Sequence, residues 1–210
     1  MGKHPKITVE EKSWDEIKAD CREWAKEIQK DYQPDLIVFI AKSGFAFAQP
    51  MNEVFQCEMV DIKASRPATG TKDFIKPIIE CLPKSVVYGI ISSPLSYWFH
   101  GRRHERSVIE TDRLLRECKK EHKKILIVDD SLDTGWTMRA AHDKIVTLFP
   151  HAEIKVAVYA IIDGHIDDVV ADYARNHNMI IVTATSRRSD EYDLFLSKLT
   201  EWNEGIDSNE

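Results

Sequence analysis

The sequence predicts an α/β protein with a mostly parallel central sheet flanked by helices. Two apolar runs, Asp35–Ile40 and Ile125–Val128, have the composition of strands that are buried on both faces, as strands of a parallel sheet are. A short turn follows each run, and helical periodicity follows the turn, over Phe45–Val54 and Met138–Phe149. Because helical crossovers join strands that run in the same direction, this alternation indicates a parallel sheet.

The composition excludes several classes of protein. A net charge of -6 gives no reason to expect nucleic-acid binding. No apolar run approaches the roughly 20 residues that span a bilayer, and Met1–Pro5 lacks the apolar segment of a signal peptide. The four cysteines are scattered, with no CxxC pair, which disfavours a disulfide framework or a zinc site. We therefore expect a cytoplasmic protein with no nucleic-acid or membrane partner.

The amino-terminal half begins with a helix and continues into the first strand–turn–helix unit. Ser13 and Glu16 form a capping-box pattern, and apolar residues then recur at helical spacing. Pro34 ends this helix because proline disfavours helical geometry in the residue before it. The elements expected in this half are a helix over 14–32, a strand over 35–40, a turn over 41–44, a helix over 45–54 and a strand over 57–62.

The carboxyl-terminal half is expected to continue the alternation. The predicted strands are Val86–Ile91, Ile125–Val128, Ile154–Ile162 and Met179–Thr183. The predicted helices are Ser107–His122, Met138–Phe149, Ile166–Arg175 and Tyr192–Trp202. A polar tail is expected over 203–210, and one domain accounts for the whole pattern.

The stretch from Ile125 to Thr137 indicates an anion site. Asp129 and Asp130 follow the apolar residues where the strand is expected to end, and a Thr-Gly-Trp-Thr turn leads into the next helix. Backbone N–H groups at a helix N-terminus bind phosphate, and the threonine hydroxyls, such as that of Thr134, add donors. The two carboxylates can accept hydrogen bonds from sugar hydroxyls or hold a hydrated Mg²⁺. A phosphorylated sugar would satisfy both halves of the site.

A second candidate site lies in the turn after the first strand. Lys42, Ser43 and Gly44 place a cation and exposed backbone N–H groups at the carboxyl end of that strand. In open α/β sheets this edge is where ligands bind. Considered alone, Lys42 is typical of an ordinary surface lysine. The presence of a second strand–turn–helix unit, the one with the acidic pair, favours a functional role for Lys42.

The segment Ser92–Arg106 is crowded with aromatic and basic residues. Two interpretations stay open from composition: a solvated loop that leads into a charged helix, or a mobile cationic lid that closes over a polyphosphate. A nucleic-acid groove also combines basic and aromatic residues, but one such loop in an acidic protein gives it little support.

Two families place an acidic pair after a strand of this kind. The run Ile125–Ser131 resembles the opening of a response-regulator receiver domain. That family needs this strand first, followed by later strands ending in an Asp and a Lys, and too little of the chain follows here. The resemblance also leaves most of the chain unexplained, so we set it aside.

The second resemblance, to type I phosphoribosyltransferases, covers residues 8–162. Val128–Thr137 resembles that family's binding motif for 5-phosphoribosyl-1-diphosphate (PRPP), and Ile40–Phe45 resembles its pyrophosphate loop. Ser96-Tyr97 resembles the Ser-Tyr pair of its mobile loop. An Asp directly before Thr-Gly, here Asp133, is similar to the 6-oxopurine branch, which acts on hypoxanthine, guanine and xanthine. Four motifs stand in the family's order.

The resemblance implies roles for these residues. Asp129 and Asp130 would hold the ribose hydroxyls and, through water, Mg²⁺. The phosphate loop, defined as Asp133, Thr134, Gly135, Trp136 and Thr137, would wrap the 5′-phosphate. The pyrophosphate loop, defined as Lys42, Ser43 and Gly44, would bind the leaving group, with Ser96, Tyr97, Arg102 and Arg103 contributed by the mobile loop. Asp133 and Lys42 would be the catalytic residues, with Asp133 taking or sharing the N7 proton of a purine.

The sequence departs from the family pattern in three places. Trp136 occupies a place that usually holds Gly or Lys, and residues 64–85 have the character of an insertion. Residues 163–202, expected to form a hood on the same domain, show no clear match to the part of the family that reads the base. Lys155 is a poorly aligned candidate for contacting the base, and Tyr159, Ile161 and Ile162 are candidates for an apolar wall.

These observations predict a Mg²⁺-dependent phosphoribosyltransferase that uses PRPP and a purine-like base, releases pyrophosphate and forms a homodimer. Two alternatives stay open: a phosphoribosyltransferase for a different base, and a non-catalytic regulator that senses PRPP or a nucleotide with the same fold.

Overall fold

The computed structural model describes residues 7–65, 107–162 and 171–207, and the isolated positions 83, 86, 88 and 89. The elements in chain order are β1 (Thr8–Glu11), α1 (Trp14–Gln29), β2 (Leu36–Ala41), α2 (Phe45–Phe55), β3 (Glu58–Ser65), β4 (Ser107–Glu110), α6 (Asp112–Glu117), β5 (Lys124–Leu132), α7 (Trp136–Leu148), β6 (Glu153–Ile161), β7 (Tyr173–His177), β8 (Met179–Val182) and α8 (Tyr192–Asp207). None of the helices described is long and apolar enough to cross a bilayer.

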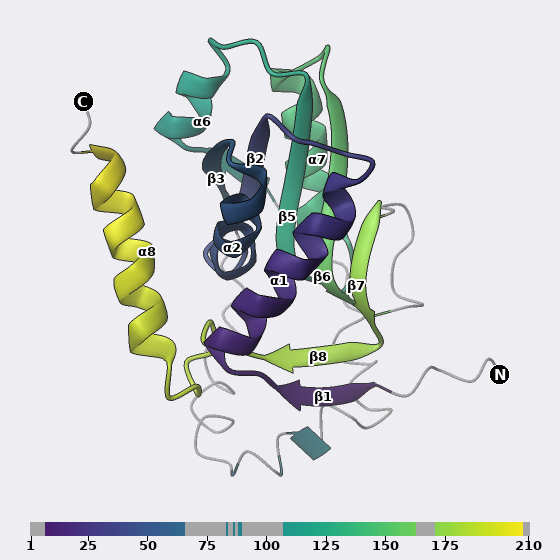
Figure 1. Cartoon of the computed structure of the whole chain (residues 1–210), viewed down its shortest axis with the longest axis vertical. Helices are drawn as coiled ribbons and strands as arrows, with labels where there is room; N and C mark the ends of the chain where they lie inside the picture. The colour runs from purple at the N-terminus through teal and green to yellow at the C-terminus, as the bar shows by residue number, and fades with distance from the viewer. Residues whose placement is uncertain are drawn as a thin grey trace, which may run out of the picture.

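Six strands form the main sheet in the order β4-β3-β2-β5-β6-β7. Every neighbouring pair is parallel except β3 with β4. In Figure 1, α1 and α2 lie on the near face of this sheet and α7 lies on the far face. The predicted α/β fold, a mostly parallel sheet flanked by helices, is confirmed.

Alternation along the central strands divides the core into two layers. On β2, Ile37 and Phe39 face the layer formed with α1, α2 and α8, whereas Val38 and Ile40 face the layer formed with α7. Successive residues of a strand point to opposite faces of the sheet. A strand covered on both faces therefore needs an unbroken apolar run, which is the pattern the sequence carries.

The capping box at the start of α1 is present as predicted. The Ser13 side chain accepts a hydrogen bond from the Glu16 N–H, and the Glu16 carboxylate accepts one from the Ser13 N–H at 2.8 Å. The buried face of α1 carries the residues that set its helical spacing, Trp14, Ile17, Cys21, Trp24 and Ile28.

A second sheet pairs β1 with β8, two strands from opposite ends of the chain. Asn178 joins this sheet to the main one, because its N–H donates to the Ile161 carbonyl at 2.7 Å while its carbonyl accepts from the Thr8 N–H at 3.0 Å. Figure 1 shows the two strands lying across the lower end of the main sheet, where the parallel strands finish. The predicted hood contains β8, but the amino-terminal strand that pairs with it was not anticipated.

A polar cluster fastens this second sheet to α1. Arg175 Nη2 lies 2.7 Å from Asp20 Oδ1, the hydroxyl of Tyr159 donates to Asp20, and Lys12 Nζ donates to that hydroxyl at 3.3 Å. Burial alone would raise the pKa of Asp20, but its hydrogen bonds to Tyr159 and Arg175 hold that pKa below its ordinary value. The carboxylate of Asp20 is thus a charged anchor on α1 that connects β6, β7 and Lys12, the residue directly after β1.

Two helices predicted from local pattern are wrong in part. The segment predicted as one helix over Ser107–His122 contains the edge strand β4 and the short helix α6, separated by Thr111. Pairing with β3 explains the strand, and the Thr111 hydroxyl caps α6 while donating to the Asp61 carbonyl at 2.7 Å. The helix predicted over Ile166–Arg175 is replaced at its end by β7, which pairs with β6.

Two further boundaries and one further element type differ from the prediction. β5 continues to Leu132, so Asp129 and Asp130 lie inside the strand and not after it. Residues 86, 88 and 89 are helical, whereas a strand was predicted there. α8 extends to Asp207, five residues beyond its predicted end, so most of the expected polar tail belongs to the helix.

Candidate functional site

The two carboxylates of β5 lie near the carboxyl end of one of the two central strands of the sheet. The side chain of Asp129 is only 7% exposed, and Asp129 Oδ1 accepts a hydrogen bond from the Asp130 N–H at 2.9 Å. Asp130 is half-buried, and Ser131 Oγ donates to its Oδ1 at 3.3 Å. The pair therefore offers one carboxylate that is fixed within the protein and one that has access to solvent.

The phosphate loop turns the chain from β5 into α7. Gly135 has φ 78° and precedes the first helical residue, a left-handed conformation that glycine adopts without strain. No side chain caps the start of α7, and its first turn contains no acidic residue. The first N–H groups of a helix have no partner within the helix. The loop thus has the backbone donors and the dipole that favour an anion.

The pyrophosphate loop lies against the backbone of β5. A Cβ at Gly44 would meet the Ile40 carbonyl at 2.6 Å and the Val128 carbonyl at 3.0 Å, so only glycine fits this close approach. The peptide between Ala41 and Lys42 is cis. β2 and β5 are parallel neighbours, so the turns after both strands are together at one edge, as predicted.

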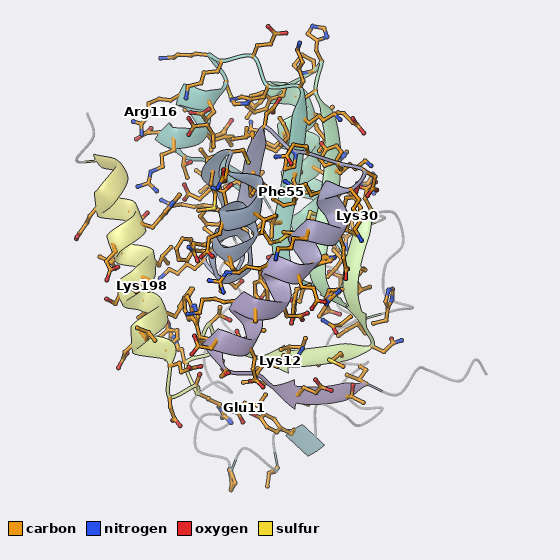
Figure 2. The ribbon with its side chains drawn as sticks, viewed as in Figure 1. Glu11, Lys12, Lys30, Phe55, Arg116 and Lys198 are labelled. Carbon is orange, nitrogen blue, oxygen red and sulfur yellow. The ribbon has the colours of Figure 1, made fainter. Side chains whose placement is uncertain are left out.

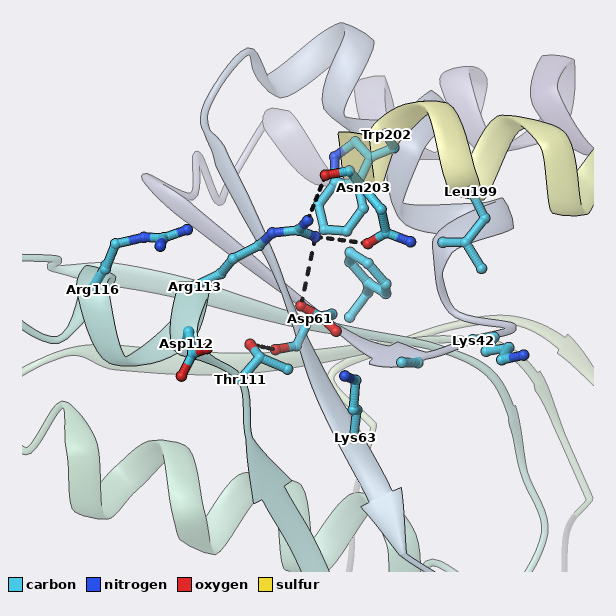
Figure 3. Close-up of a pocket in the computed structure, with 12 residues that line it drawn as sticks. Lys42, Asp61, Lys63, Thr111, Asp112, Arg113, Arg116, Leu199, Trp202 and Asn203 are labelled. Carbon is cyan, nitrogen blue, oxygen red and sulfur yellow. Dashed lines mark hydrogen bonds and ion pairs between the residues drawn. The ribbon is translucent and has the colours of Figure 1, made fainter. Parts of the chain in front are cut away.

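A polar cavity of about 440 Å³ borders the pyrophosphate loop on the face covered by α8. Figure 3 shows it beneath the carboxyl-terminal half of α8, with Lys42 at one end and Arg116 at the other. Its lining residues are Phe39, Ala41, Lys42, Asp61, Lys63, Thr111, Asp112, Arg113, Arg116, Leu199, Trp202 and Asn203. Of the predicted site residues that the structure describes, only Lys42 lines this cavity.

The predicted mobile-loop residues Ser96, Tyr97, Arg102 and Arg103 lie outside the described residues, as do most of residues 64–85. The structure does fix where that connection starts and ends. Ser65 pairs with Ser107 in the antiparallel register of β3 and β4. The described residues on either side of these two segments are therefore neighbours at one edge of the sheet.

The candidates for base recognition on β6 are not at this site. Lys155 is near the amino end of β6, where its Nζ donates to the Tyr173 hydroxyl at 3.1 Å and lies 4.8 Å from the Tyr32 ring centroid. Tyr159 is fully buried beneath α1 and α2, with its ring 4.7 Å from that of Phe47. Lys155 as a base contact is wrong because it lies near the amino end of β6, whereas the candidate site is at the carboxyl ends of the strands. Tyr159 as a pocket wall is wrong because its side chain is part of the hydrophobic core.

Comparison with known proteins identifies the family. The model of the family described as "Phosphoribosyl transferase domain" matches residues 13–179, more than half of the chain. No sequence match was found among curated proteins.

Three solved structures share the fold. The xanthine-guanine-hypoxanthine phosphoribosyltransferase of Helicobacter pylori aligns with a TM-score of 0.58 at 14% identity, over 90% of this chain and 98% of that one. A purine phosphoribosyltransferase of Pyrococcus horikoshii aligns with a TM-score of 0.55 at 18% identity, over 84% and 93%. A hypothetical protein of Neisseria gonorrhoeae with bound ppGpp aligns with a TM-score of 0.58 at 13% identity, over 95% and 99%.

At these identities the structural likeness establishes the fold, and the family match establishes membership. The matched segment begins at the capping box of α1 and ends at Met179, the first residue of β8, so it contains the acidic pair and both loops. The chain belongs to the phosphoribosyltransferase domain family.

Proposed function

We propose that this protein is a Mg²⁺-dependent phosphoribosyltransferase that moves the 5-phosphoribosyl group from PRPP to a 6-oxopurine and releases pyrophosphate. The observation that carries the proposal is that two candidate anion-binding turns, after β2 and after β5, lie at one edge of the sheet. The acidic pair is near the end of β5, between these two turns. PRPP has a phosphate at one end, a diphosphate at the other and ribose hydroxyls in the middle, which is the same order of charges.

Each part of PRPP has a proposed partner. The 5′-phosphate accepts hydrogen bonds from the N–H groups at the start of α7 and from the Thr134 and Thr137 hydroxyls. Asp129 and Asp130 accept hydrogen bonds from the ribose hydroxyls. Lys42 neutralises charge that develops on the diphosphate as it leaves.

The reaction replaces one bond at the ribose C1 carbon with another. The bond from C1 to the diphosphate oxygen breaks, the diphosphate takes the electron pair, and the purine nitrogen forms a new bond to C1. Asp133, half-buried beside the phosphate loop, accepts the proton that the purine loses at N7. Solvent then receives the proton from Asp133 and restores the carboxylate.

The acidic pair fits a magnesium ion better than it fits a metal held by protein alone. Among the residues that the structure describes, no group of three or more His, Cys, Asp or Glu side chains could hold a metal ion. Magnesium characteristically keeps several waters and binds through one or two carboxylates and substrate phosphates. Asp129 and Asp130 would hold it through water, and when bound it would supply positive charge to the diphosphate.

The choice of a 6-oxopurine is supported by Asp133 directly before Thr-Gly and by the fold likeness to the Helicobacter pylori and Pyrococcus horikoshii enzymes. A second candidate, a regulator that senses PRPP or a nucleotide without turnover, is favoured by the likeness to the ppGpp-bound protein of Neisseria gonorrhoeae. The family resemblance further suggests a homodimer, which light scattering measures.

A panel of bases separates these candidates. Purified protein is incubated with PRPP and Mg²⁺ and with hypoxanthine, guanine, xanthine, adenine or orotate, and pyrophosphate release is measured. We expect release with at least one of the three 6-oxopurines at a rate well above that with adenine or orotate. Release only with adenine or orotate would reassign the base. PRPP binding without release for any base would favour the regulator.

A further inference from the structure

The carboxyl-terminal helix α8 is attached to the rest of the molecule near both of its ends. Just before its start, Glu191 Oε2 accepts a hydrogen bond from the Trp14 N–H at 2.7 Å. Near its end, Arg113 of α6 donates from Nη1 and Nη2 to the side chain and the carbonyl of Asn203, each at 2.9 Å (Figure 3). The two attachments fix the position of α8 over the core layer that it shares with α1 and α2.

Two aromatic rings of α8 lie beside Phe45, the first residue of α2. The Phe45 ring centroid is 5.6 Å from that of Trp202 and 6.4 Å from that of Phe195. A third ring, that of Phe39 on β2, is 5.8 Å from Phe45 and 5.1 Å from Trp202. Aromatic pairs at these separations attract each other beyond the effect of burial. Two of these three neighbours of the buried Phe45 ring thus come from α8.

Phe45 is directly connected to the pyrophosphate loop. It follows Gly44, and its N–H donates to the Lys42 carbonyl at 3.2 Å. The Ala46 N–H donates to the Ser43 carbonyl at 3.1 Å. Because these bonds join the loop to the first turn of α2, a shift of Phe45 would move the loop backbone with it. The close approach of Gly44 to the backbone of β2 and β5 holds the other side of the loop.

Arg113 sets the position of Trp202. Its guanidinium carbon lies 4.4 Å from the Trp202 ring centroid, and a cation over an aromatic ring is attracted to the face of that ring. Its hydrogen bonds to Asn203 hold the residue that follows Trp202. Arg113 is itself oriented by β3, because its Nη1 is 4.0 Å from Asp61 Oδ1 and its side chain is only 13% exposed. α6 and β3 therefore place the tryptophan as much as α8 does.

We propose that Trp202 is a positioning residue for the pyrophosphate loop and that it acts through the Phe45 ring. A binding loop that is held in its productive geometry before the ligand arrives loses less conformational entropy on binding, and its affinity is higher for that reason. α8 thus strengthens diphosphate binding by fixing the loop, without itself contacting the ligand. This inference rests on the proposed function, because it requires that the pyrophosphate loop binds diphosphate.

Two simple ligands test the role of Trp202. Inorganic pyrophosphate probes the pyrophosphate loop, and ribose 5-phosphate probes the phosphate loop. Each is titrated calorimetrically, with Mg²⁺ present, into wild-type protein, Trp202→Leu and Trp202→Phe. We expect Trp202→Leu to bind pyrophosphate about five- to tenfold more weakly than wild-type protein and ribose 5-phosphate within about twofold of it. Trp202→Phe keeps a ring beside Phe45 and should recover most of the pyrophosphate affinity.

Phe55→Leu is the matched control. Phe55 is the last residue of α2 and belongs to the same core layer as Phe45, at the end of the helix away from the pyrophosphate loop (Figure 2). Urea unfolding measures the stability of each variant. We expect Phe55→Leu to lower the free energy of unfolding, because it leaves space in the core, and to leave the affinity for both ligands unchanged.

The proposal is overturned if Trp202→Leu binds pyrophosphate as tightly as wild-type protein does, or if it loses affinity for both ligands equally. A loss of pyrophosphate affinity in Phe55→Leu as large as that in Trp202→Leu would also overturn it, since a weakened core would then explain both. Wild-type protein that binds neither ligand would contradict the proposed function together with this inference, so the two failures can be told apart.

Discussion

Replacement of Asp133 by asparagine is expected to reduce turnover by about 10²–10⁴-fold while PRPP affinity stays within about twofold, because general-base catalysis contributes rate enhancements of this size. Asparagine keeps the shape of the side chain and cannot accept the purine proton. Pre-steady-state pyrophosphate release gives the rate, and calorimetric titration with PRPP and Mg²⁺ gives the affinity.

Asp130→Asn is the matched comparison for this prediction. It makes the same chemical change three residues earlier, at a carboxylate that we propose contacts the ribose and the hydrated metal. It should weaken PRPP binding, whereas Asp133→Asn should leave it nearly unchanged. Unchanged turnover in Asp133→Asn would remove the proton-accepting role from that residue.

Gly44→Ala is expected to destabilise the protein and to disturb PRPP binding. The added Cβ would meet the Ile40 carbonyl at 2.6 Å and the Val128 carbonyl at 3.0 Å, and these are backbone atoms of adjacent strands that cannot move aside independently. Overpacking of this kind costs about 1–3 kcal/mol in free energy of unfolding. Urea unfolding gives the change in free energy, and calorimetry gives the change in PRPP affinity.

Gly205→Ala provides the control within the same chain. Gly205 is in α8, and a Cβ there would meet nothing within 4 Å. Replacing glycine by alanine inside a helix should raise the free energy of unfolding by about 0.5–1 kcal/mol. Equal effects of the two variants would show that Gly44 is not held in a close approach.

The parallel core was predictable because its pattern is local and its burial is complete. β2 and β5 are apolar over consecutive residues, and in a chain of this length such runs require cover on both faces. The start of α1 was also predictable, since Ser13 and Glu16 satisfy donors within three residues of each other. Both signals depend on neighbours in sequence.

The elements that sequence reasoning missed depend on distant partners. β4 is a strand because β3 offers it an edge, although its residues continue directly into a charged segment. The second sheet needs β1 and β8, whose paired residues Thr8 and Met179 are far apart in the chain. A local sequence pattern does not predict either of these strand pairings.

The site was predictable to the same extent. The acidic pair, the phosphate loop and the pyrophosphate loop each lie within one turn of a strand end, so motif and spacing could predict that they lie at the same edge of the sheet. The cavity beneath α8 combines Lys63, Arg116 and Trp202 from three separate elements. Lys63 offered the one usable signal, because extending the predicted strand beyond Ile62 would have placed it beside Ala41 at the same edge.

The central claim is that the edge formed by β2 and β5 binds PRPP, and a calorimetric titration of wild-type protein with PRPP and Mg²⁺ tests it most directly. The account predicts saturable binding with one PRPP per chain, weakened when Asp130 is replaced by asparagine. Absence of binding by folded wild-type protein, or binding that Asp130→Asn leaves unchanged, would contradict it.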